Sequence, residues 1–348
     1  MIKSLKAVNV GPWKEAPLTF GPRLNVITGD NGLGKSLLLD LAWFAVTGAW
    51  PAGLNPKLMH GAPARPRLSS IPSRIEARIR GPREERSTHA AFSSEDWRWT
   101  FNAEKSGEPA ILLYSMADGG LGAWLGDRSR SPVVLTQREV FDGLTAEGGA
   151  MLINGLLADW SIWSDSRRFE DLNAQMNAVL GALSPEGWPY ASGRPVRADI
   201  DDVRRAPTIK MPWGAEVPIT LASSSVKRTV ALAYMLVWAV NEYAELAKFK
   251  GKPFEPHLTL LIDDVESHLS PRRQTLIVPA MLRAVEALFG LLGTSASLQL
   301  ILTTNSALVT SSIEGMFDDK LDTWHCLELG EDDVRITTLT PQDACRGD

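Results

Sequence analysis

Eight residues near the N-terminus constrain the fold of this chain more than any other segment. Residues 29–36 read GDNGLGKS and fit the pattern G-x-x-x-x-G-K-[ST]. They follow an apolar segment at 23–28 that predicts a buried strand, and they precede an apolar segment at 36–47 that predicts a helix buried on most sides. Strand, glycine-rich loop and helix in this order predict a phosphate-binding loop, or P-loop, within an α/β fold.

The predicted ligands of this loop are ATP and Mg²⁺. Glycines let backbone N–H groups surround phosphate oxygens, Lys35 is expected to reach the β and γ phosphates, and Ser36 offers a hydroxyl to Mg²⁺. A glycine turn without a ligand is the alternative, and the flanking strand and helix disfavour it. The predicted nucleotide-binding residues are Gly29, Asp30, Asn31, Gly32, Leu33, Gly34, Lys35, Ser36 and Leu37.

A second segment supplies an acidic residue for the metal. In residues 258–271, LTLLIDDVESHLSP, an apolar run ends at Asp263, which predicts that this carboxylate lies at the C-terminal end of a buried strand. There it can hold Mg²⁺ as a Walker B aspartate. A strand that ends in a solvated acidic turn is the alternative. The stretch between Lys35 and Asp263 is longer than a small GTPase-like fold needs, so we expect a P-loop domain that is split by an insertion.

Several motifs together resemble one class of ATPase. A predicted N-terminal β-hairpin, GDNGLGKS, a serine-rich segment followed by KR, IDDVESHLSP and TTNS occur in this order. They are similar to the IDEPE-x-HLHP class of bacterial ABC-type ATPases, relatives of RecF, SMC heads and the OLD family. The resemblance covers about residues 1–50 and 215–310, and the middle of the chain is matched only loosely. It implies an ABC-type ATPase head.

The resemblance implies a signature loop within residues 221–236, LASSSVKRTVALAYML. Ser223, Ser224 and Ser225 would present hydroxyl and N–H groups at a helix N-terminus to the γ-phosphate of a nucleotide bound by the other protomer. Such proteins close head to tail around two ATP molecules, so the expected partner is a second copy of the chain. A serine run that only caps the helix is the alternative.

The resemblance also implies catalytic residues, and three positions depart from the family. Asp264 stands where the family has the glutamate that positions water, Ser225 where the signature has glycine, and Asn305 where a histidine senses the γ-phosphate. Aspartate is one methylene shorter than glutamate, and Asn305 cannot accept a proton. Glu266 could stand in for the glutamate, and Gln137 is a candidate for the Q-loop glutamine. We therefore expect tight MgATP binding with slow turnover.

The expected fold is an α/β ABC-type ATPase head with a mixed sheet, an inserted antiparallel sheet and a helical subdomain. Residues 1–50 and 206–348 would form the nucleotide-binding lobe, 51–136 the antiparallel β insertion and 137–205 the helical subdomain. Sustained heptads are absent, so we expect no long coiled-coil arms, and no sequence follows Asp348 for the TOPRIM domain of OLD nucleases. The strands expected in the insertion are 75–79, 97–101, 111–116 and 121–125, and the main later helices are expected at 226–248 and 273–289.

Composition indicates an ordinary folded protein. Hydrophobic residues make up 44% of the chain and charged residues 22%. The start of the chain lacks the apolar core of a signal peptide and no apolar run is long enough to cross a bilayer, so we expect a cytoplasmic protein with no membrane partner. Cys326 and Cys345 do not form a metal-spaced pair, which disfavours a disulfide framework and a zinc site.

DNA and an effector protein are further candidate partners. The resemblance implies control of DNA transactions or of an attached effector, in DNA repair or in defence against phage. An ATP sensor that clamps without cycling and regulates a separate effector is the alternative, and a transporter ATPase is disfavoured. A formal charge of −5 gives no overall attraction to a polyanion, so DNA contact would need a local basic patch. A strand edge guarded by charge is the other interpretation of the basic segment at 65–86. Its arginines are Arg65, Arg67, Arg74, Arg78, Arg80, Arg83 and Arg86.

Overall fold

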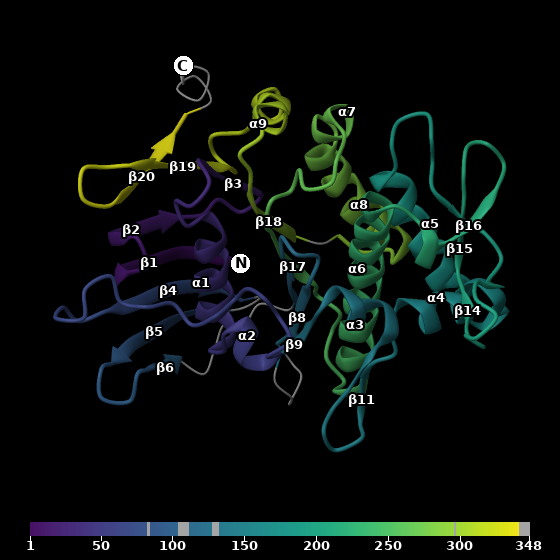
Figure 1. Ribbon diagram of the computed structural model, residues 1–348, viewed down its shortest axis with the longest axis horizontal. Coiled ribbons are helices and arrows are strands. Elements are labelled where there is room, and N and C mark those ends of the chain that lie inside the picture. Colours follow the sequence, from purple (N-terminus) through teal and green to yellow (C-terminus); the bar gives the residue numbers. More distant parts are fainter. Residues whose placement is uncertain (82–83, 104–110, 127–131, 296, 341–348) are drawn as a thin grey trace.

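The computed structural model describes residues 1–81, 84–103, 111–126, 132–295 and 297–340 (Figure 1). The described residues form two larger sheets with a helix between them, and a layer of helices covers the far side of one sheet (Figure 1). Two hydrophobic cores result, one on each face of the larger sheet. This architecture confirms the predicted mixed α/β fold with additional antiparallel strands.

The larger sheet has eight strands. They are β3 (Leu24–Gly29), β7 (Ile111–Ser115), β8 (Leu121–Leu125), β9 (Val133–Leu135), β17 (His257–Ile262), β18 (Ser297–Thr303), β19 (Thr323–Leu329) and β20 (Val334–Leu339). Their order is β20-β19-β3-β18-β17-β7-β8-β9. The central strands from β19 to β7 are parallel, whereas β20, β8 and β9 are antiparallel to the strands they pair with. Both faces of the central strands are covered, which explains their nearly continuous apolar sequence.

The smaller sheet holds the N-terminal hairpin and is antiparallel. It consists of β1 (Ile2–Val10), β2 (Trp13–Thr19), β4 (Arg74–Arg80), β5 (Glu85–Ser93) and β6 (Arg98–Ala103) in the order β2-β1-β4-β5-β6. Helix α1 (Lys35–Thr47) lies between this sheet and the larger one, and the short helix α2 (Pro51–Leu54) follows it. Burial from two sides accounts for the apolar character of α1 around its whole circumference.

The expectation of one antiparallel sheet for the segments at 75–79, 97–101, 111–116 and 121–125 was wrong. The first two belong to the smaller sheet as β4 and β6, but the last two belong to the larger sheet as β7 and β8. Strand β7 is buried on both faces and pairs antiparallel with β8 and parallel with β17. Its hairpin partner is visible in the sequence, whereas its parallel partner is far away along the chain. The domain boundaries at 50, 136 and 205 stay predictions.

The helical layer packs against the larger sheet on the face opposite α1 (Figure 1). Its members are α3 (Gln137–Asp142), α4 (Leu156–Asp165), α5 (Glu170–Leu183), α6 (Ser224–Phe249), α7 (Pro271–Gln274), α8 (Ile277–Leu291) and α9 (Ala307–Glu314). The long helix expected at 226–248 is confirmed as α6. The single helix expected at 273–289 is two helices, because Thr275 and Leu276 interrupt it, and α9 was not predicted.

Short elements complete the described part of the chain. They are β10 (Leu144–Thr145), β11 (Met151–Ile153), β12 (Ala191–Ser192), β13 (Val196–Arg197), β14 (Arg205–Ala206), β15 (Thr208–Lys210), β16 (Glu216–Pro218) and the 3₁₀ helices at Arg167–Phe169 and Ile219–Leu221. Among the helices of the described residues, none combines the length and apolar character needed to cross a membrane.

A buried carboxylate joins the first residues of β3 to the segment that leads into β19. Asp322 is buried, and its two oxygens accept hydrogen bonds of 2.9 and 2.5 Å from the guanidinium of Arg23. They also accept backbone N–H bonds from Leu24 at 3.0 Å and from Asp318 at 2.9 Å. A bidentate guanidinium–carboxylate pair with further N–H donors is a strong arrangement. It fixes the start of the strand that carries the P-loop.

Replacement of Asp322 by alanine is expected to lower the free energy of unfolding by about 2–4 kcal/mol, because it leaves Arg23 and two backbone N–H groups without their acceptor. Urea unfolding of the purified protein measures this change. Glu186→Ala is the control, since it breaks an exposed ion pair with Arg272 and should leave stability nearly unchanged. Equal effects of the two substitutions would contradict the anchoring role of Asp322.

Candidate nucleotide-binding site

Parallel strands of the larger sheet end at one edge, and the segments that follow them meet there. The P-loop follows β3, the acidic segment follows β17, Asn305 follows β18, and a turn at 116–120 follows β7. Figure 1 shows β18 and β17 next to each other at the centre of the molecule. In open α/β sheets, ligands bind outside the carboxyl ends of the strands. Segments that are far apart in the sequence therefore share one candidate site.

The P-loop has the backbone that a phosphate cradle requires. Gly29 and Gly34 have φ angles of 136° and 98°, which glycine adopts without strain. A Cβ on Gly29 would lie 2.5 Å from the carbonyl oxygen of Leu327, so only glycine fits there. The side chain of Lys35 is folded along the loop, and its Nζ donates to the carbonyl oxygens of Gly29 at 2.7 Å and Asp30 at 3.1 Å. This places the ammonium inside the loop, where a phosphate would meet it.

The remaining residues predicted from this motif lie in the loop or in the first turn of α1. Helix α1 begins at Lys35, so its first N–H groups have no partner within the helix and face the loop. Glycines with positive φ, a helix N-terminus and an ammonium group are the donors that fit a bound triphosphate. The loop contains Asp30, Asn31, Gly32 and Leu33, and the first turn contains Ser36 and Leu37.

Asp263 lies at the end of β17, as predicted, with only 3% of its surface exposed. Its Oδ1 accepts a 2.6 Å hydrogen bond from the hydroxyl of Thr303 on the neighbouring strand β18. Within the described residues no hydrogen bond to its other oxygen, Oδ2, is present. A carboxylate with one oxygen held and the other open, together with the exposed Ser36 hydroxyl, is a donor set that fits Mg²⁺.

Asp264 occupies an unusual backbone conformation next to Asp263. Its φ angle is +46°, in the left-handed region that aspartate tolerates better than most residues. The N–H of Asp264 donates a 2.9 Å hydrogen bond to the hydroxyl of Thr303. Partial burial raises the pKa of its carboxyl group, and the charges of Asp263 and Glu266 raise it further, while Lys35 opposes them. The local potential is therefore negative, which suits a cation.

Glu266 and Asn305 connect the acidic segment with the P-loop. The two oxygens of Glu266 accept hydrogen bonds from the hydroxyl of Thr304 at 2.7 Å and from the backbone N–H of Asn305 at 2.9 Å. The amide of Asn305 donates a 2.7 Å hydrogen bond to Oδ1 of Asn31 in the P-loop. Glu266 thus holds the loop after β18 in place with both oxygens. Asn305 lies beside the P-loop, and its role as a γ-phosphate sensor stays a prediction.

The serine run opens helix α6. Ser223 is the N-cap, and its hydroxyl accepts a 3.5 Å hydrogen bond from the N–H of Val226. Ser224 and Ser225 are the first helical residues, and the hydroxyl of Ser225 accepts a 2.5 Å hydrogen bond from the guanidinium of Arg273. Capping by Ser223 therefore occurs in this structure, while a contact of the run with a partner's nucleotide stays a prediction.

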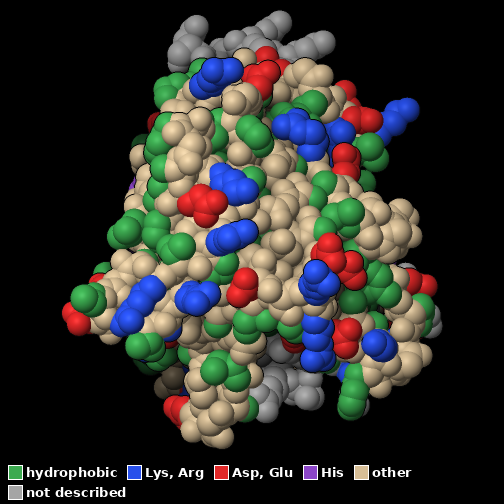
Figure 2. All heavy atoms as spheres, turned by 90° about the vertical axis from the view of Figure 1, so that its right-hand side faces the viewer, with side chains coloured by type: hydrophobic (Ala, Val, Ile, Leu, Met, Phe, Trp, Pro, Cys, Tyr) green, Lys and Arg blue, Asp and Glu red, His purple; other side chains and the backbone are tan. Residues whose placement is uncertain are grey.

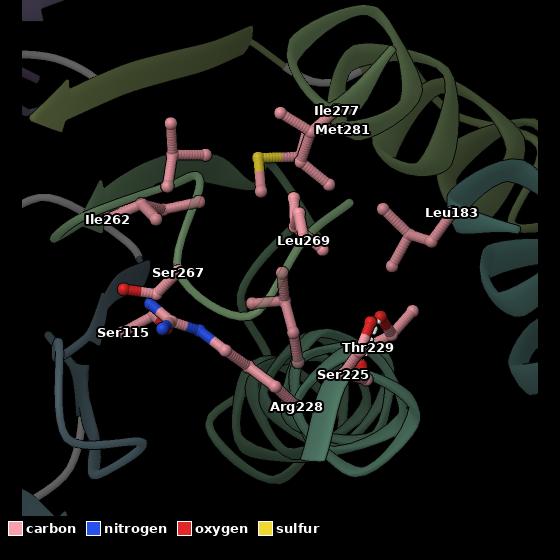
Figure 3. Close-up of a pocket in the computed structure, with 12 residues that line it drawn as sticks. Ser115, Leu183, Ser225, Arg228, Thr229, Ile262, Ser267, Leu269, Ile277 and Met281 are labelled. Carbon is pink, nitrogen blue, oxygen red and sulfur yellow. Dashed lines mark hydrogen bonds between the residues drawn. The ribbon is translucent and has the colours of Figure 1, made fainter. Parts of the chain in front are cut away.

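A small cavity separates the start of α6 from the acidic segment. Its volume is about 30 Å³, which is space for about one water molecule. Figure 3 shows Ser225 and Thr229 on one side of it and Leu269 on the other. Arg228 extends from α6 toward Ser115 and Ser267 (Figure 3). Its guanidinium donates a 2.8 Å hydrogen bond to the carbonyl oxygen of Asp263. Arg228 thus joins the first turns of α6 to the acidic segment.

Gln137 is the first residue of α3, which is closed at its N-terminus by a capping box of Thr136 and Glu139. Its side chain lies against Gly119, where an added Cβ would be 3.2 Å from the Gln137 amide. Gly119 belongs to the turn after β7, the strand next to β17. The structure thus brings Gln137 beside the edge that carries the site, and its role as a Q-loop residue stays a prediction.

Sequence reasoning missed Asp40, a buried acid on α1. Its Oδ1 accepts a 3.0 Å hydrogen bond from the hydroxyl of Tyr114 on β7. Burial raises the pKa of Asp40 to about 7, the Tyr114 bond lowers it, and the charges of Asp263 and Asp118 raise it again. Asp40 comes four residues after Ser36, and this spacing places both on one face of the helix. The four-residue spacing between Ser36 and Asp40 in the sequence could therefore have identified Asp40 as a candidate site residue.

Asp40→Asn is expected to change how stability depends on pH. The folded chain keeps a proton on Asp40 up to about pH 7, whereas the unfolded chain loses it near pH 4. This carboxyl group therefore favours folding at low pH, and that contribution is lost as the pH rises toward 7. Urea unfolding should show the stability of the variant relative to the natural chain rising by about 2–3 kcal/mol from pH 5 to pH 8. If the stability of the variant and that of the natural chain changed with pH in the same way, the raised pKa of Asp40 would be contradicted. Asp319→Asn changes an exposed aspartate and serves as the control.

Comparison with known proteins places the N-terminal part of the chain near one domain family. A family model described as "AAA domain" matches residues 4–85, a segment that includes the P-loop and α1. None of the curated proteins compared with the chain matches it.

Two solved structures of SMC head domains are similar over nearly the whole chain. One, the SMC head bound to the C-winged helix domain of ScpA, has 16% identity and a TM-score of 0.52, and the match covers 99% of each chain. The other, from Pyrococcus furiosus, is an SMC head domain with an extended coiled coil bound to the C-terminal domain of ScpA. It has 12% identity and a TM-score of 0.54, and the match covers 99% of this chain and 98% of that chain. The chain therefore has the fold of an SMC head domain.

Proposed function

We propose that this protein is an ATPase that binds MgATP at the P-loop and hydrolyses it slowly. The observation that carries the proposal is the convergence of Lys35 after β3 with Asp263 after β17 at one edge of the sheet. This is the arrangement that P-loop NTPases use for phosphoryl transfer. The match of residues 4–85 to an AAA domain and the SMC-head fold support it.

Each residue of the site has its own role in the proposed transfer of the γ-phosphoryl group to water. The N–H groups of the P-loop and Lys35 bind the phosphates and stabilise their charge. Ser36 and Asp263 would hold Mg²⁺, which would neutralise negative charge on the phosphates. Asp264 positions the attacking water, and Asn305 donates to the γ-phosphate. Gln137 would approach the site from the start of α3, beside Gly119 in the turn after β7.

Slow turnover follows from the geometry of the acidic residues. Asp264 is one methylene shorter than the glutamate of the similar ATPases, and a misplacement of about 1 Å costs roughly 100-fold in rate. Both oxygens of Glu266 already accept hydrogen bonds from the loop at 304–305, which favours Asp264 over Glu266 as the residue that positions water. Asn305 can donate to a phosphate but cannot take up a proton.

The proposed consequence of ATP binding is closure of two copies of the chain. ATP in the P-loop of one protomer would meet Ser223, Ser224 and Ser225 of its partner, and hydrolysis or release would reopen the pair. Such a switch would gate DNA repair or defence against phage, either on DNA or through an effector protein. An SMC head in one similar structure binds a domain of ScpA, so a bound partner protein is compatible with this fold.

The basic segment gives DNA binding limited support. Its arginines are largely engaged: Arg74 pairs with Glu76 at 3.1 Å, Arg80 pairs with Glu85 at 2.8 Å, and Arg86 is buried. Arg83 lies outside the described residues. Figure 2 shows the side of the molecule where α4, α5 and β14–β16 lie, away from β4 and β5, and on that side basic and acidic side chains are interspersed. DNA contact and contact with an effector protein both stay predictions.

Lys35→Ala is expected to weaken ATP binding by about 10–100-fold, since charge-assisted hydrogen bonds contribute about 1.5–3 kcal/mol. Isothermal titration with ATP and Mg²⁺ measures the affinity, and steady-state phosphate release, with and without duplex DNA, measures turnover. Lys210→Ala is a matched control, because that exposed lysine lies on β15 in a separate sheet. Unchanged affinity in Lys35→Ala would refute the proposed site. Turnover of the natural protein above about 10 s⁻¹, an ordinary enzyme rate, would refute slow hydrolysis.

A catalytically degenerate ATP sensor is the second candidate, and the occupied oxygens of Glu266 together with the short Asp264 favour it. Asp264→Glu separates the two candidates. For a slow ATPase, the longer side chain is expected to raise turnover by about 10–100-fold, whereas Asp264→Asn abolishes turnover and keeps ATP binding. ATP binding without turnover in the natural protein and in both variants would instead identify a sensor that regulates a separate effector.

A further inference from the structure

Thr303 stands at the centre of the acidic segment without a role in the proposed reaction. It is the last residue of β18, it is 0% exposed, and it lies beside Asp263 because β17 and β18 pair in parallel register. Its hydroxyl contacts two groups at once: it donates to Asp263 Oδ1 at 2.6 Å and accepts from the N–H of Asp264 at 2.9 Å. Its carbonyl oxygen accepts a third hydrogen bond from the N–H of Val265 at 3.2 Å.

The polarity of these hydrogen bonds is fixed by chemistry. A backbone N–H can only donate, so Asp264 N–H must be the donor to the Thr303 hydroxyl. The hydroxyl has a single proton, which is therefore directed at the carboxylate of Asp263. This bond holds Oδ1 on the strand side and leaves Oδ2 as the oxygen that can face a cation. The same hydroxyl fixes the Asp264 peptide in its left-handed conformation.

We propose that Thr303 is a positioning residue for the metal site, in that its hydroxyl orients Asp263 toward Mg²⁺ and sets the direction of the Asp264 side chain. The proposal rests on the proposed function, since it assigns to Thr303 a part in MgATP binding. Groups that hydrogen-bond to metal ligands orient them, and their loss costs about 10–100-fold in metal affinity or activity. The Thr303 hydroxyl is placed to act in this way, because it hydrogen-bonds to the carboxylate of Asp263 and to the backbone N–H of Asp264.

The fold itself does not require the hydroxyl. The backbone of Thr303 pairs with Ile27 of β3, and its carbonyl bond to Val265 is independent of the side chain. Valine has the same branched shape as threonine without the hydroxyl. Thr303→Val therefore removes the two side-chain hydrogen bonds while keeping the packing volume.

Another buried threonine serves as a matched control. Thr259 lies on β17, is 1% exposed, and its hydroxyl has no hydrogen-bond partner within the described residues. Thr259→Val makes the same chemical change in the strand next to β18, away from the acids. It reports what the loss of a buried threonine hydroxyl does when no metal ligand depends on it.

The test measures the dissociation constant of ATP by isothermal titration, once with Mg²⁺ and once with EDTA, for the natural protein and each variant. Thr303→Val is expected to raise the constant measured with Mg²⁺ by about 10-fold or more and to leave the constant measured with EDTA nearly unchanged. Thr303→Ser keeps the hydroxyl and should restore the Mg²⁺-dependent affinity. Thr259→Val should behave as the natural protein in both solutions.

Each outcome has one meaning. Equal Mg²⁺-dependent affinity in Thr303→Val and in the natural protein overturns the positioning role while leaving the proposed function intact. Failure of the natural protein to bind ATP in either solution refutes the proposed function instead. A parallel loss in both solutions, with a lowered thermal midpoint, shows that Thr303 acts only on the fold and also overturns the inference. If Thr303→Val does not fold, Thr303→Ala removes the same hydroxyl and takes its place.

Discussion

The parallel pairing of β3, β18 and β17 is the constraint on which the rest of this molecule depends. Parallel neighbours end at the same edge, so whatever follows each strand must meet there, however far apart the segments are in sequence. The pairing requires that both faces of the sheet be covered. Helix α1 with the smaller sheet covers one face, and α5, α6 and α8 cover the other. The strand and the helix that flank the P-loop are thus both largely buried.

The same convergence concentrates negative charge. Asp264 and Asp40 both lie near Asp263, and burial raises the pKa values of Asp264 and Asp40, which disfavours the ionised forms of these two groups. Two nearby cations are Lys35, which is held on P-loop carbonyls, and the partly buried Arg228. Burial lowers the pKa of Arg228, while the acids oppose that shift. A divalent cation would relieve the mutual repulsion of the acids. The negative potential of the site without ligand therefore favours the binding of such a cation.

The sequence predicted the parts of the site that are local and missed those that depend on which strands become neighbours. The P-loop, Asp263 and Asn305 follow directly from apolar runs that end in polar residues, and the structure places all of them at one edge. The role of Thr303 could not be predicted from the sequence, because threonine is common at the ends of strands. Its contact with Asp263 depends on β17 being the neighbouring strand. The assignment of β7 failed for the same reason, since the hairpin turn after it pointed to β8 and nothing nearby pointed to β17.

The departures from the similar ATPases are integrated into the surrounding contacts. The Ser225 hydroxyl, where the signature loop has glycine, is held by Arg273, and glycine could not make that bond. The amide of Asn305, where a histidine is usual, bonds to Asn31 of the P-loop. The Asp264 backbone is fixed by Thr303. The altered side chains of Ser225 and Asn305 thus each have a specific partner in the surrounding contacts. A side chain that is held in place can present its donors in a fixed direction, which supports the proposal that the site binds ATP and turns it over slowly.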